Sequence, residues 1–340
     1  MRGKSVDWFA VYKLPKLDGT SGQEFVYTGS DEPRPVRGTD IASATEAVGA
    51  TVSQMYSSSS ESHFWLMYSD DDPLKEADSY RGHAKGVALF DATTGFWMTH
   101  SVPNFPPRGA PFTYPASASK YGQSFFCASM QVEHLAALAD HWRFIQASPY
   151  SINVPDKFAV RFPTLKNVEA RQSLSRSATQ FWTSKAVRTV QGVSLMTYAK
   201  HKKFDGDIWN DIVSRQNKVT LAVESWLNGS GDDLHTTCTA TSQTHDVTQI
   251  RVGDVSFASS KDHSKWAVSN TQSNPIVCFG DMNRQKSQLK RGGGAICIQN
   301  RDLWQIYHSA VAQVEPCKAF SHFSPFSAIL SILLIGSPSF

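Results

Sequence analysis

This sequence lacks the compact motifs of cofactor-dependent and metal-dependent enzymes. It contains no P-loop, no Gly-x-Ser-x-Gly nucleophile elbow and no paired metal-ligand motif. None of its five cysteines forms a Cys-x-x-Cys pair, which argues against a zinc ribbon or a thioredoxin-like redox site. We therefore predict an active site without a metal or other cofactor, and cysteines that form disulfide bonds, as in secreted proteins.

Long apolar runs are also absent. Segment 328–335 is apolar but far shorter than the roughly 20 residues that a membrane-spanning helix needs, so we expect no stable membrane association. The chain begins Met1-Arg2-Gly3-Lys4 without an apolar leader, which fits either a cytosolic protein or an incomplete N-terminus. The cysteines and a glycosylation sequon at Asn228 favour the second interpretation.

Net charge is small at neutral pH but depends strongly on histidine. The 340 residues carry a formal charge of +3, and protonation of the 11 histidines would add 11 further positive charges. The protein would therefore hold a polyanion better near pH 5 than at neutral pH. A length of 340 residues with 41% apolar residues allows two ordinary domains or one large one.

A His-x-Lys motif occurs twice, in Arg81-Gly82-His83-Ala84-Lys85-Gly86 and in Lys261-Asp262-His263-Ser264-Lys265-Trp266. In an extended chain, residues i and i+2 point to the same side, so each motif sets an imidazole beside an ammonium. This pair suits a phosphodiester, because lysine can neutralise the non-bridging oxygens while histidine acts as nucleophile or proton carrier. Two such motifs facing one another would complete a site.

The surroundings of the two motifs repeat in order. Each motif is followed by a strand, a turn, a strand ending near an asparagine (Asn104 or Asn283), a loop, a cysteine-bearing strand and a helix. We predict an α/β protein of two similar halves, each a mixed β-sheet flanked by helices, with the site between them. The halves are residues 1–165 and 166–317, and the divergent tail 318–340 is predicted to be disordered.

Hydrophobic patterns predict the main elements. Strands are expected at 6–14, 63–68, 123–130, 219–226 and 246–257, helices at 43–56, 132–144, 207–213 and 303–314, and loops over 16–40; the pattern over 176–190 is ambiguous.

Basic residues gather at two further places. A third His-x-Lys sequence, His201-Lys202-Lys203, precedes a predicted helix rather than a strand, and we interpret it as a solvated or phosphate-contacting surface. A glycine-rich turn near residue 292 is surrounded by four cations, which fit either a clamp on a phosphodiester backbone, the interpretation we favour, or a flexible basic loop: Arg284, Lys286, Lys290 and Arg291. Four histidines without such a context are interpreted as structural or surface residues: His100, His134, His141 and His308.

Several stretches together resemble the deoxyribonuclease II family, which is itself similar to the phospholipase D superfamily. They are Val6-Asp7-Trp8-Phe9, Tyr12-Lys13-Leu14-Pro15, both His-x-Lys motifs, Gly95-Phe96-Trp97, His100-Ser101-Val102-Pro103-Asn104-Phe105-Pro106-Pro107, Tyr121-Gly122-Gln123, Gly280-Asp281-Met282-Asn283-Arg284 and Arg291-Gly292-Gly293-Gly294. The resemblance covers residues 6–317. It implies two phospholipase D-like halves that share one active site.

The resemblance also implies a function. Members are expected to cut double-stranded DNA at acid pH without a metal, in lysosomes or after secretion, leaving 3′-phosphate and 5′-hydroxyl ends. The catalytic residues would be His83, Lys85, His263 and Lys265. Asn104 and Asn283 match positions where superfamily members use an asparagine near the phosphate. The nearest counterpart of the superfamily's aspartate after the first motif is Asp91.

The same resemblance suggests disulfides Cys238–Cys317 and Cys278–Cys297. The family's early cysteine has no counterpart in this sequence, which would leave Cys127 without a partner.

Other interpretations stay open from the sequence. A phospholipase D-type hydrolase of other phosphodiesters would use the same four residues, and a catalytically impaired DNA-binding relative would share the fold. The sequence does not determine which histidine attacks phosphorus. A monomer is sufficient for a site with both motifs in one chain, and a homodimer is equally compatible.

Overall fold

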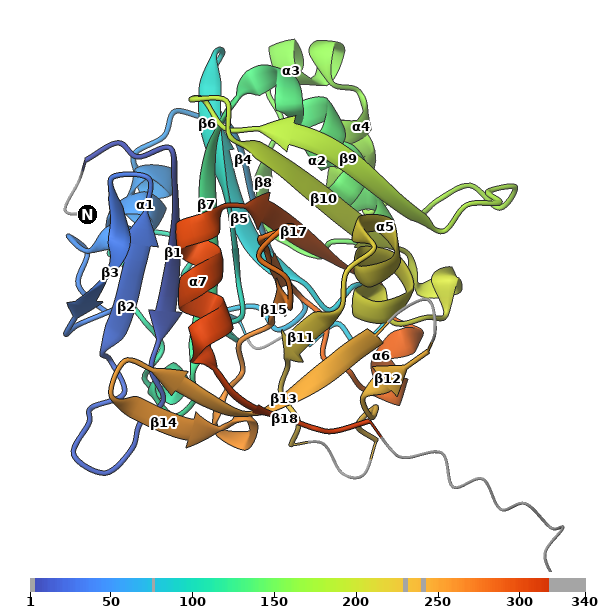
Figure 1. Cartoon of the computed structure of the whole chain (residues 1–340). Coiled ribbons are helices and arrows are strands. Elements are labelled where there is room, and N and C mark those ends of the chain that lie inside the picture. The colour runs from blue at the N-terminus through green and yellow to red at the C-terminus, as the bar shows by residue number, and fades with distance from the viewer. Residues whose placement is uncertain (1–3, 75–76, 229–231, 240–242, 318–340) are drawn as a thin grey trace, which may run out of the picture.

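The computed structural model describes residues 4–74, 77–228, 232–239 and 243–317, and it shows an α/β fold built on two large sheets (Figure 1). The tail predicted to be disordered lies outside these residues. The first sheet has the strand order β3 (Glu32–Gly38), β2 (Phe25–Gly29), β1 (Trp8–Lys13), β7 (Gln123–Gln131), β6 (Thr94–His100), β5 (Lys85–Phe90), β4 (Phe64–Ser69) and β8 (Pro149–Asn153).

The second sheet follows in the chain. Its order is β12 (Thr237–Cys238), β13 (Gln243–Val252), β11 (Leu221–Glu224), β15 (Trp266–Ser269), β16 (Ile276–Gly280), β17 (Gly293–Gln299), β10 (Ser194–Lys200) and β9 (Trp182–Arg188), while β14 (Val255–Ala258) and β18 (Val311–Val314) pair with β13. This sheet is mixed, as expected, because β11 and β13 run parallel. Every pair in the first sheet is antiparallel instead, since its neighbouring strands are joined largely by hairpins.

Helices lie between and outside the sheets. The α-helices are α1 (Ala47–Tyr56), α2 (Leu135–Phe144), α3 (Asp156–Arg161), α4 (Thr164–Glu169), α5 (Arg215–Asn217), α6 (Lys286–Leu289) and α7 (Arg301–Ala310). The segment η4 (Ile208–Ser214) is a π-helix, and short 3₁₀ turns are η1 (Ala116–Ser119), η2 (Val132–His134), η3 (Lys202–Phe204) and η5 (Ser259–Lys261). The two sheets divide between β8 and β9, and the predicted boundary at 165/166 falls inside α4 in that connection.

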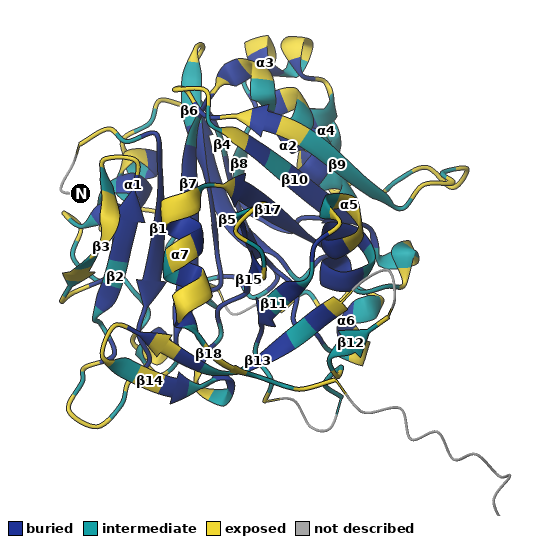
Figure 2. Cartoon of the chain, in the orientation of Figure 1, coloured by how far each residue is buried: buried dark blue, intermediate teal, exposed yellow. Residues whose placement is uncertain are grey.

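One hydrophobic core joins the two sheets. It contains alternate residues of β1, such as Trp8 and Tyr12, together with apolar residues of α2, α7 and the second sheet. Phe126 and Phe279, one from each sheet, stack with ring centroids 4.8 Å apart. The intervening residues of β1, Phe9 and Val11, face α1 in a separate cluster, as the two-residue period of a strand requires. Helix α7 packs one side against the shared core and exposes the other, so buried and exposed residues alternate along it (Figure 2).

The predicted repeat is present in the structure. The first motif leads into β5, β6, β7 and α2, and the second leads into β15, β16, β17 and α7 in the same order. The predicted disulfides Cys238–Cys317 and Cys278–Cys297 are both formed. The second lies across the β16–β17 ladder, and Cys127 is buried without a disulfide partner among the described residues.

Two element predictions were wrong. The expected loops over 16–40 contain the hairpin β2–β3, because Phe25 and Tyr27 alternate into the core despite the surrounding glycines and prolines. Strand β3 tolerates Pro33 and Pro35 because it lies at the edge of its sheet. The expected helix at 303–314 ends at Ala310, and the chain continues as strand β18.

Among the described residues, no helix combines the length and apolar character needed to cross a membrane.

Buried histidines make stability depend on pH. His141 of α2 lies edge-on to Trp97 with ring centroids 4.9 Å apart, and its Nδ1 has no hydrogen-bond partner among the described residues. Burial lowers its pKa from 6.5 to about 3. The unfolded chain therefore takes up a proton below pH 6.5 that the folded protein does not bind until about pH 3, so stability falls as pH falls through this window.

We predict that His141→Asn flattens this dependence. The wild type should lose about 2 kcal/mol more free energy of unfolding than the variant when the pH falls from 7.5 to 5, because the variant lacks this depressed pKa. Urea denaturation at both pH values measures the change. An equal difference between variant and wild type at the two pH values would contradict the prediction.

Candidate active site

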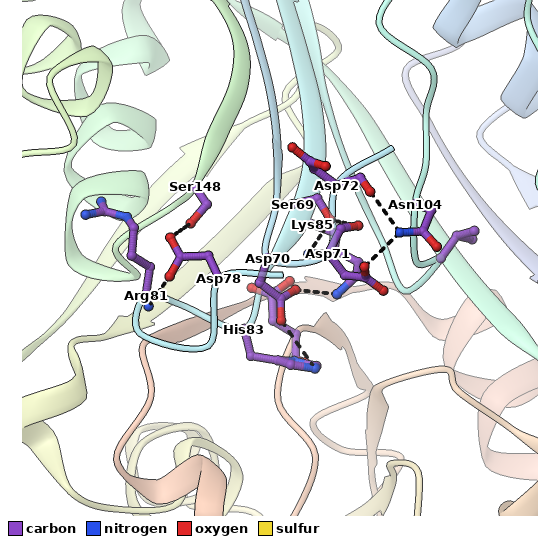
Figure 3. A network of polar contacts seen from close by, with 12 residues as sticks. Ser69, Asp70, Asp71, Asp72, Asp78, Arg81, His83, Lys85, Asn104 and Ser148 are labelled. Atoms are coloured by element: carbon purple, nitrogen blue, oxygen red, sulfur yellow. Dashed lines mark hydrogen bonds and ion pairs between the residues drawn. The ribbon is translucent and has the colours of Figure 1, made fainter. Parts of the chain in front are cut away.

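The first motif lies against an aspartate at the end of the neighbouring strand. Lys85 pairs with Ser69 across β4 and β5, so the next residue, Asp70, is beside the motif. The ammonium of Lys85 donates to Asp70 Oδ1, and Nε2 of His83 lies 4.0 Å from Asp70 Oδ2 (Figure 3). Arg291 donates to the same carboxylate at 3.2 Å. Asp70 is thus a shared anion for three basic side chains.

His83 is fixed by backbone atoms of the second half. Its Nδ1 lies 2.6 Å from the carbonyl oxygen of Asp281, and its peptide nitrogen donates to the carbonyl of Gly292 at 2.9 Å. A carbonyl only accepts, so Nδ1 must carry the proton and donate. In the neutral imidazole this leaves the lone pair on Nε2.

The second motif is fixed by the first half. The peptide nitrogen of His263 donates to the carbonyl of Gly122 at 2.9 Å, and Gly122 donates to the carbonyl of Lys261 at 2.9 Å. The buried carboxylate of Asp262 accepts from the Tyr12 hydroxyl and from the amide of Ser264. A Cβ at position 122 would lie 2.4 Å from Asp262 Oδ1, so this contact requires glycine.

Aromatic rings enclose the imidazole of His263. Tyr121 stacks on it with centroids 4.2 Å apart and planes 7° apart, and the Trp226 ring lies 4.0 Å away at 55°. The Lys265 ammonium donates to the carbonyl of His263 at 2.6 Å. Among the described residues, His263 Nε2 is buried and has no hydrogen-bond partner. The second imidazole therefore has an aromatic environment where the first has a carboxylate.

Both motifs contribute to one small cavity. Its lining includes residues from the two motifs and from two other segments: His83, Lys85, His100, Ser101, Lys265 and Asp281. The structure thus brings together side chains that are about half the chain apart in sequence. His263 lies within electrostatic range of the same group, because the charges of His83 and Lys85 both lower its pKa.

The cavity holds an excess of basic groups. Burial and the nearby cations Lys85, Lys265 and Arg291 lower the pKa of His83 to about 3, against an opposing effect of Asp70. Burial and Lys85 lower the pKa of Lys265 to about 7, and burial and Lys265 lower the pKa of His263. A bound anion would oppose these shifts, because it stabilises each protonated form. The site is therefore electrostatically suited to an anion.

The two predicted asparagines lie outside the cavity lining. The Asn104 amide donates to Asp71 Oδ1 at 2.7 Å and to the carbonyl of Asp72 at 2.8 Å, so it supports the acidic turn after β4 (Figure 3). Asn283 is buried, with its peptide nitrogen donating to Gln288 Oε1 at 2.7 Å. Its Oδ1 has no hydrogen-bond partner among the described residues. Contact of either with a phosphate stays a prediction.

The four predicted clamp cations occupy different environments. Arg284 is 1% exposed and forms ion pairs with Asp207 and Asp246, so it stabilises the interior of the second half and is not available at the surface. Arg291 is partly buried beside Asp70, whereas Lys286 and Lys290 are exposed. On this geometry, a contact with DNA stays a prediction for Lys286, Lys290 and Arg291.

The sequence reasoning missed several site residues. Asp70 was not assigned a role from the sequence, where the available signal was its position just after the strand expected at 63–68. Asp91, the nearest sequence counterpart of the superfamily's aspartate, is exposed at the β5–β6 turn and accepts from Thr93. His100 was interpreted as structural or surface, yet it is buried and lines the cavity. Asp281, whose pKa burial raises to about 7, also lines the cavity, and the sequence alone assigned it no role.

Among the described residues, a set of side chains with metal-ligand geometry is formed by Cys238, His245 and Cys317. The two cysteines are joined in a disulfide, so neither offers a thiolate. This set therefore does not fit a metal ion.

Comparison with known proteins identifies the family. The family model for deoxyribonuclease II matches residues 1–317. This chain belongs to the deoxyribonuclease II family. The family consists of nucleases, which hydrolyse phosphodiester bonds, and the cavity with two His-x-Lys motifs is its candidate active site in this chain.

Relatives match over nearly their whole length. Cell-death-related nuclease 7 of Caenorhabditis elegans is 74% identical over 98% of this chain and 91% of its own length. Deoxyribonuclease-2-alpha of Mus musculus is 32% identical over 93% of this chain and 92% of its own length. Plancitoxin-1 of Acanthaster planci is 29% identical, with 93% and 91% covered. The similarity therefore includes both sheets and both motifs.

We predict that Asp70→Asn lowers stability at pH 7. The change leaves Lys85 and Arg291 without their shared anion in a site that is about 8% exposed, and loss of one partner from a buried ion pair costs about 3 kcal/mol. The depressed pKa of Asp70 means that this contribution is complete above pH 3.8 and is lost as pH falls further.

Urea denaturation at pH 7 measures the effect. Asp254→Asn is the matched control, because Asp254 pairs with Arg37 at 3.0 Å but is 82% exposed, and such pairs contribute less than about 1 kcal/mol. Equal losses in the two variants would show that Asp70 does not have the role assigned to it.

Proposed function

We propose that this protein is a metal-independent acid endonuclease that hydrolyses double-stranded DNA to 3′-phosphate and 5′-hydroxyl ends. The observation that carries the proposal is the shared cavity, where His83, Lys85 and Lys265 meet and each motif is held by the opposite half. The names of relatives, which include deoxyribonuclease-2-alpha, support DNA as the substrate.

His83 is the nucleophile in this proposal. Its Nδ1 proton is held by the carbonyl of Asp281, so the Nε2 lone pair is available. Nε2 attacks phosphorus, a nitrogen–phosphorus bond forms, and the bond from phosphorus to the 5′-oxygen breaks. The fragment with the 3′-oxygen stays attached through the phosphorylated histidine.

His263 is the general acid and then the general base. As an imidazolium it gives its proton to the departing 5′-oxygen, and the neutral ring then takes a proton from the water that attacks the phosphohistidine. Tyr121, which stacks on the imidazole, and Trp226, which contacts it from another side, favour its cationic form. Hydrolysis restores neutral His83 and releases the 3′-phosphate.

Lysines supply the positive charge of the site. Lys85 and Lys265 both line the cavity, where each can stabilise charge on the non-bridging oxygens of the phosphodiester. Protein cations thereby perform the role that a divalent ion performs in other nucleases. This arrangement supports activity without an added metal.

The acid dependence follows from the depressed pKa of His263. In the free site this histidine is neutral near pH 7, because burial and Lys265 oppose its protonation. A bound phosphodiester raises the pKa, and lower pH increases the fraction of complexes with a protonated general acid. Activity should therefore rise as pH falls from 7.5 to 5.

A lysosomal or secreted location is part of the proposal. It is supported by the two disulfides, which persist in oxidising compartments, and by the exposed Asn228, the acceptor position of a glycosylation sequon.

We predict that plasmid DNA is cut at pH 5 in the presence of EDTA, and more slowly at pH 7.5. His83→Ala and His263→Ala should each reduce cutting at least about 100-fold, because nucleophilic and general acid catalysis are lost. Gel electrophoresis measures the rate. His308→Ala, which removes an exposed histidine of α7, should cut like the wild type.

Other outcomes would redirect the interpretation. Loss of all cutting in EDTA with recovery on adding Mg²⁺ would contradict metal independence. Hydrolysis of phosphatidylcholine without DNA cutting would identify a phospholipase D-type enzyme. DNA binding without cutting at either pH would identify a catalytically impaired relative.

We predict that His263→Asn accumulates a phosphohistidine when the leaving group needs no proton, because the variant then lacks only the base that activates water. A deoxynucleoside 3′-(4-nitrophenyl phosphate) labelled at phosphorus is mixed with the variant and quenched in alkaline detergent, since phosphohistidine is labile in acid. Label should appear on His263→Asn and be absent from His83→Asn. Label on His83→Asn alone would reverse the two roles, and no protein-bound label in either variant would contradict the covalent route.

A further inference from the structure

A shallow groove lies next to the active site and uses the third His-x-Lys sequence. Its lining comes from both halves of the chain and includes Ser79, Tyr80, Lys202, Ser287, Lys290 and Arg291. In the part of the chain that the structure describes, every charged side chain that lines the groove is a cation. The groove therefore presents positive charge and hydroxyl groups, the chemistry that recognises the sugar-phosphate backbone.

His201 has a structural part in this groove. Its Nδ1 accepts from the amide of Lys203 at 3.2 Å, and its Nε2 lies 3.0 Å from the Ser173 hydroxyl. The buried imidazole therefore caps the short turn η3 and has no free nitrogen for catalysis. The turn leaves Lys202 in the groove lining, and the π-helix η4 follows this copy of the motif where a strand follows the other two.

Tyr80 and Lys202 meet across the groove from different halves. The Tyr80 residue is 80% exposed, an unusual position for a large aromatic residue, and the Lys202 ammonium lies 4.2 Å from the centre of its ring. This contact holds the lysine in place while its outer face stays accessible to solvent. The exposed ring also offers a flat apolar surface to a sugar or a base.

Arg291 links the groove to the residues around His83. This arginine lines the groove, donates to Asp70 at 3.2 Å, and donates to the carbonyl of Arg81 at 3.2 Å. Arg81 precedes His83 by two residues, and Asp70 lies beside His83. A DNA strand with its scissile phosphodiester at His83 can therefore place a neighbouring phosphate in the groove.

We propose that this groove binds the sugar-phosphate backbone of one DNA strand beside the scissile phosphodiester, with Lys202 as a phosphate contact and Tyr80 as the residue that positions it. The inference rests on the proposed nuclease function and extends it to the binding of flanking nucleotides. It also gives the third motif a role in substrate affinity rather than in catalysis.

Binding is measured by fluorescence anisotropy with a labelled DNA duplex of about 20 base pairs at pH 5, over a range of salt concentrations. The His83→Asn background lacks the proposed nucleophile, so it neither cuts the probe nor becomes covalently attached to it. Adding Lys202→Ala should raise Kd about five- to tenfold and reduce the slope of log Kd against log salt by about one. Tyr80→Leu should raise Kd, whereas Tyr80→Phe, which keeps the ring, should not.

Lys157→Ala in the same background is the matched control. Lys157 is exposed and lies 5.4 Å from the ring centre of Phe158, but it does not line the groove. If Lys202→Ala changes Kd and salt slope no more than Lys157→Ala does, the groove proposal is wrong even when the wild type cuts DNA. If Lys202→Ala weakens binding but the wild type fails to cut, the groove stands and the proposed catalytic function fails.

Discussion

The active site depends on an exchange of backbone hydrogen bonds between the two halves. His83 of the first half is held by carbonyls of Asp281 and Gly292, and His263 of the second half is held by the carbonyl of Gly122. Neither motif is oriented by its own sheet alone. Separation of the halves would therefore remove the alignment of both imidazoles as well as the shared hydrophobic core. The stacked pair Phe126 and Phe279 connects that core across the two sheets.

The two motifs are similar in sequence but differ in their surroundings. The strand beside the first motif is followed by Asp70, which provides a carboxylate near His83. The strand beside the second motif is followed by Ser225 and Trp226, which places an aromatic ring on His263. A carboxylate and an aromatic pocket suit different steps of one reaction. This asymmetry supports the separate nucleophilic and acid–base roles proposed for the two histidines.

Excess positive charge links the site to its groove. Asp70 balances cations from both halves in the free protein, while burial and the neighbouring cations together lower the pKa values of His83 and Lys265. A phosphodiester would supply the missing negative charge and so favour protonation of the general acid. Arg291 connects this cavity to the groove with Lys202, so binding of flanking phosphates and catalysis would use one continuous basic surface.

The sequence by itself determined the α/β class, the repeated order of elements, both disulfides and the two His-x-Lys motifs, because these depend on local periodicity and on a family pattern. Only the tertiary structure decided that Asp70 contacts His83 and Lys85 and that His100 lines the cavity, while Asn104 and Arg284 make contacts elsewhere. Those outcomes depend on strand register and on the packing of one half against the other. A sequence pattern specifies which side of a strand a residue occupies, but the partner on that side comes from a distant segment.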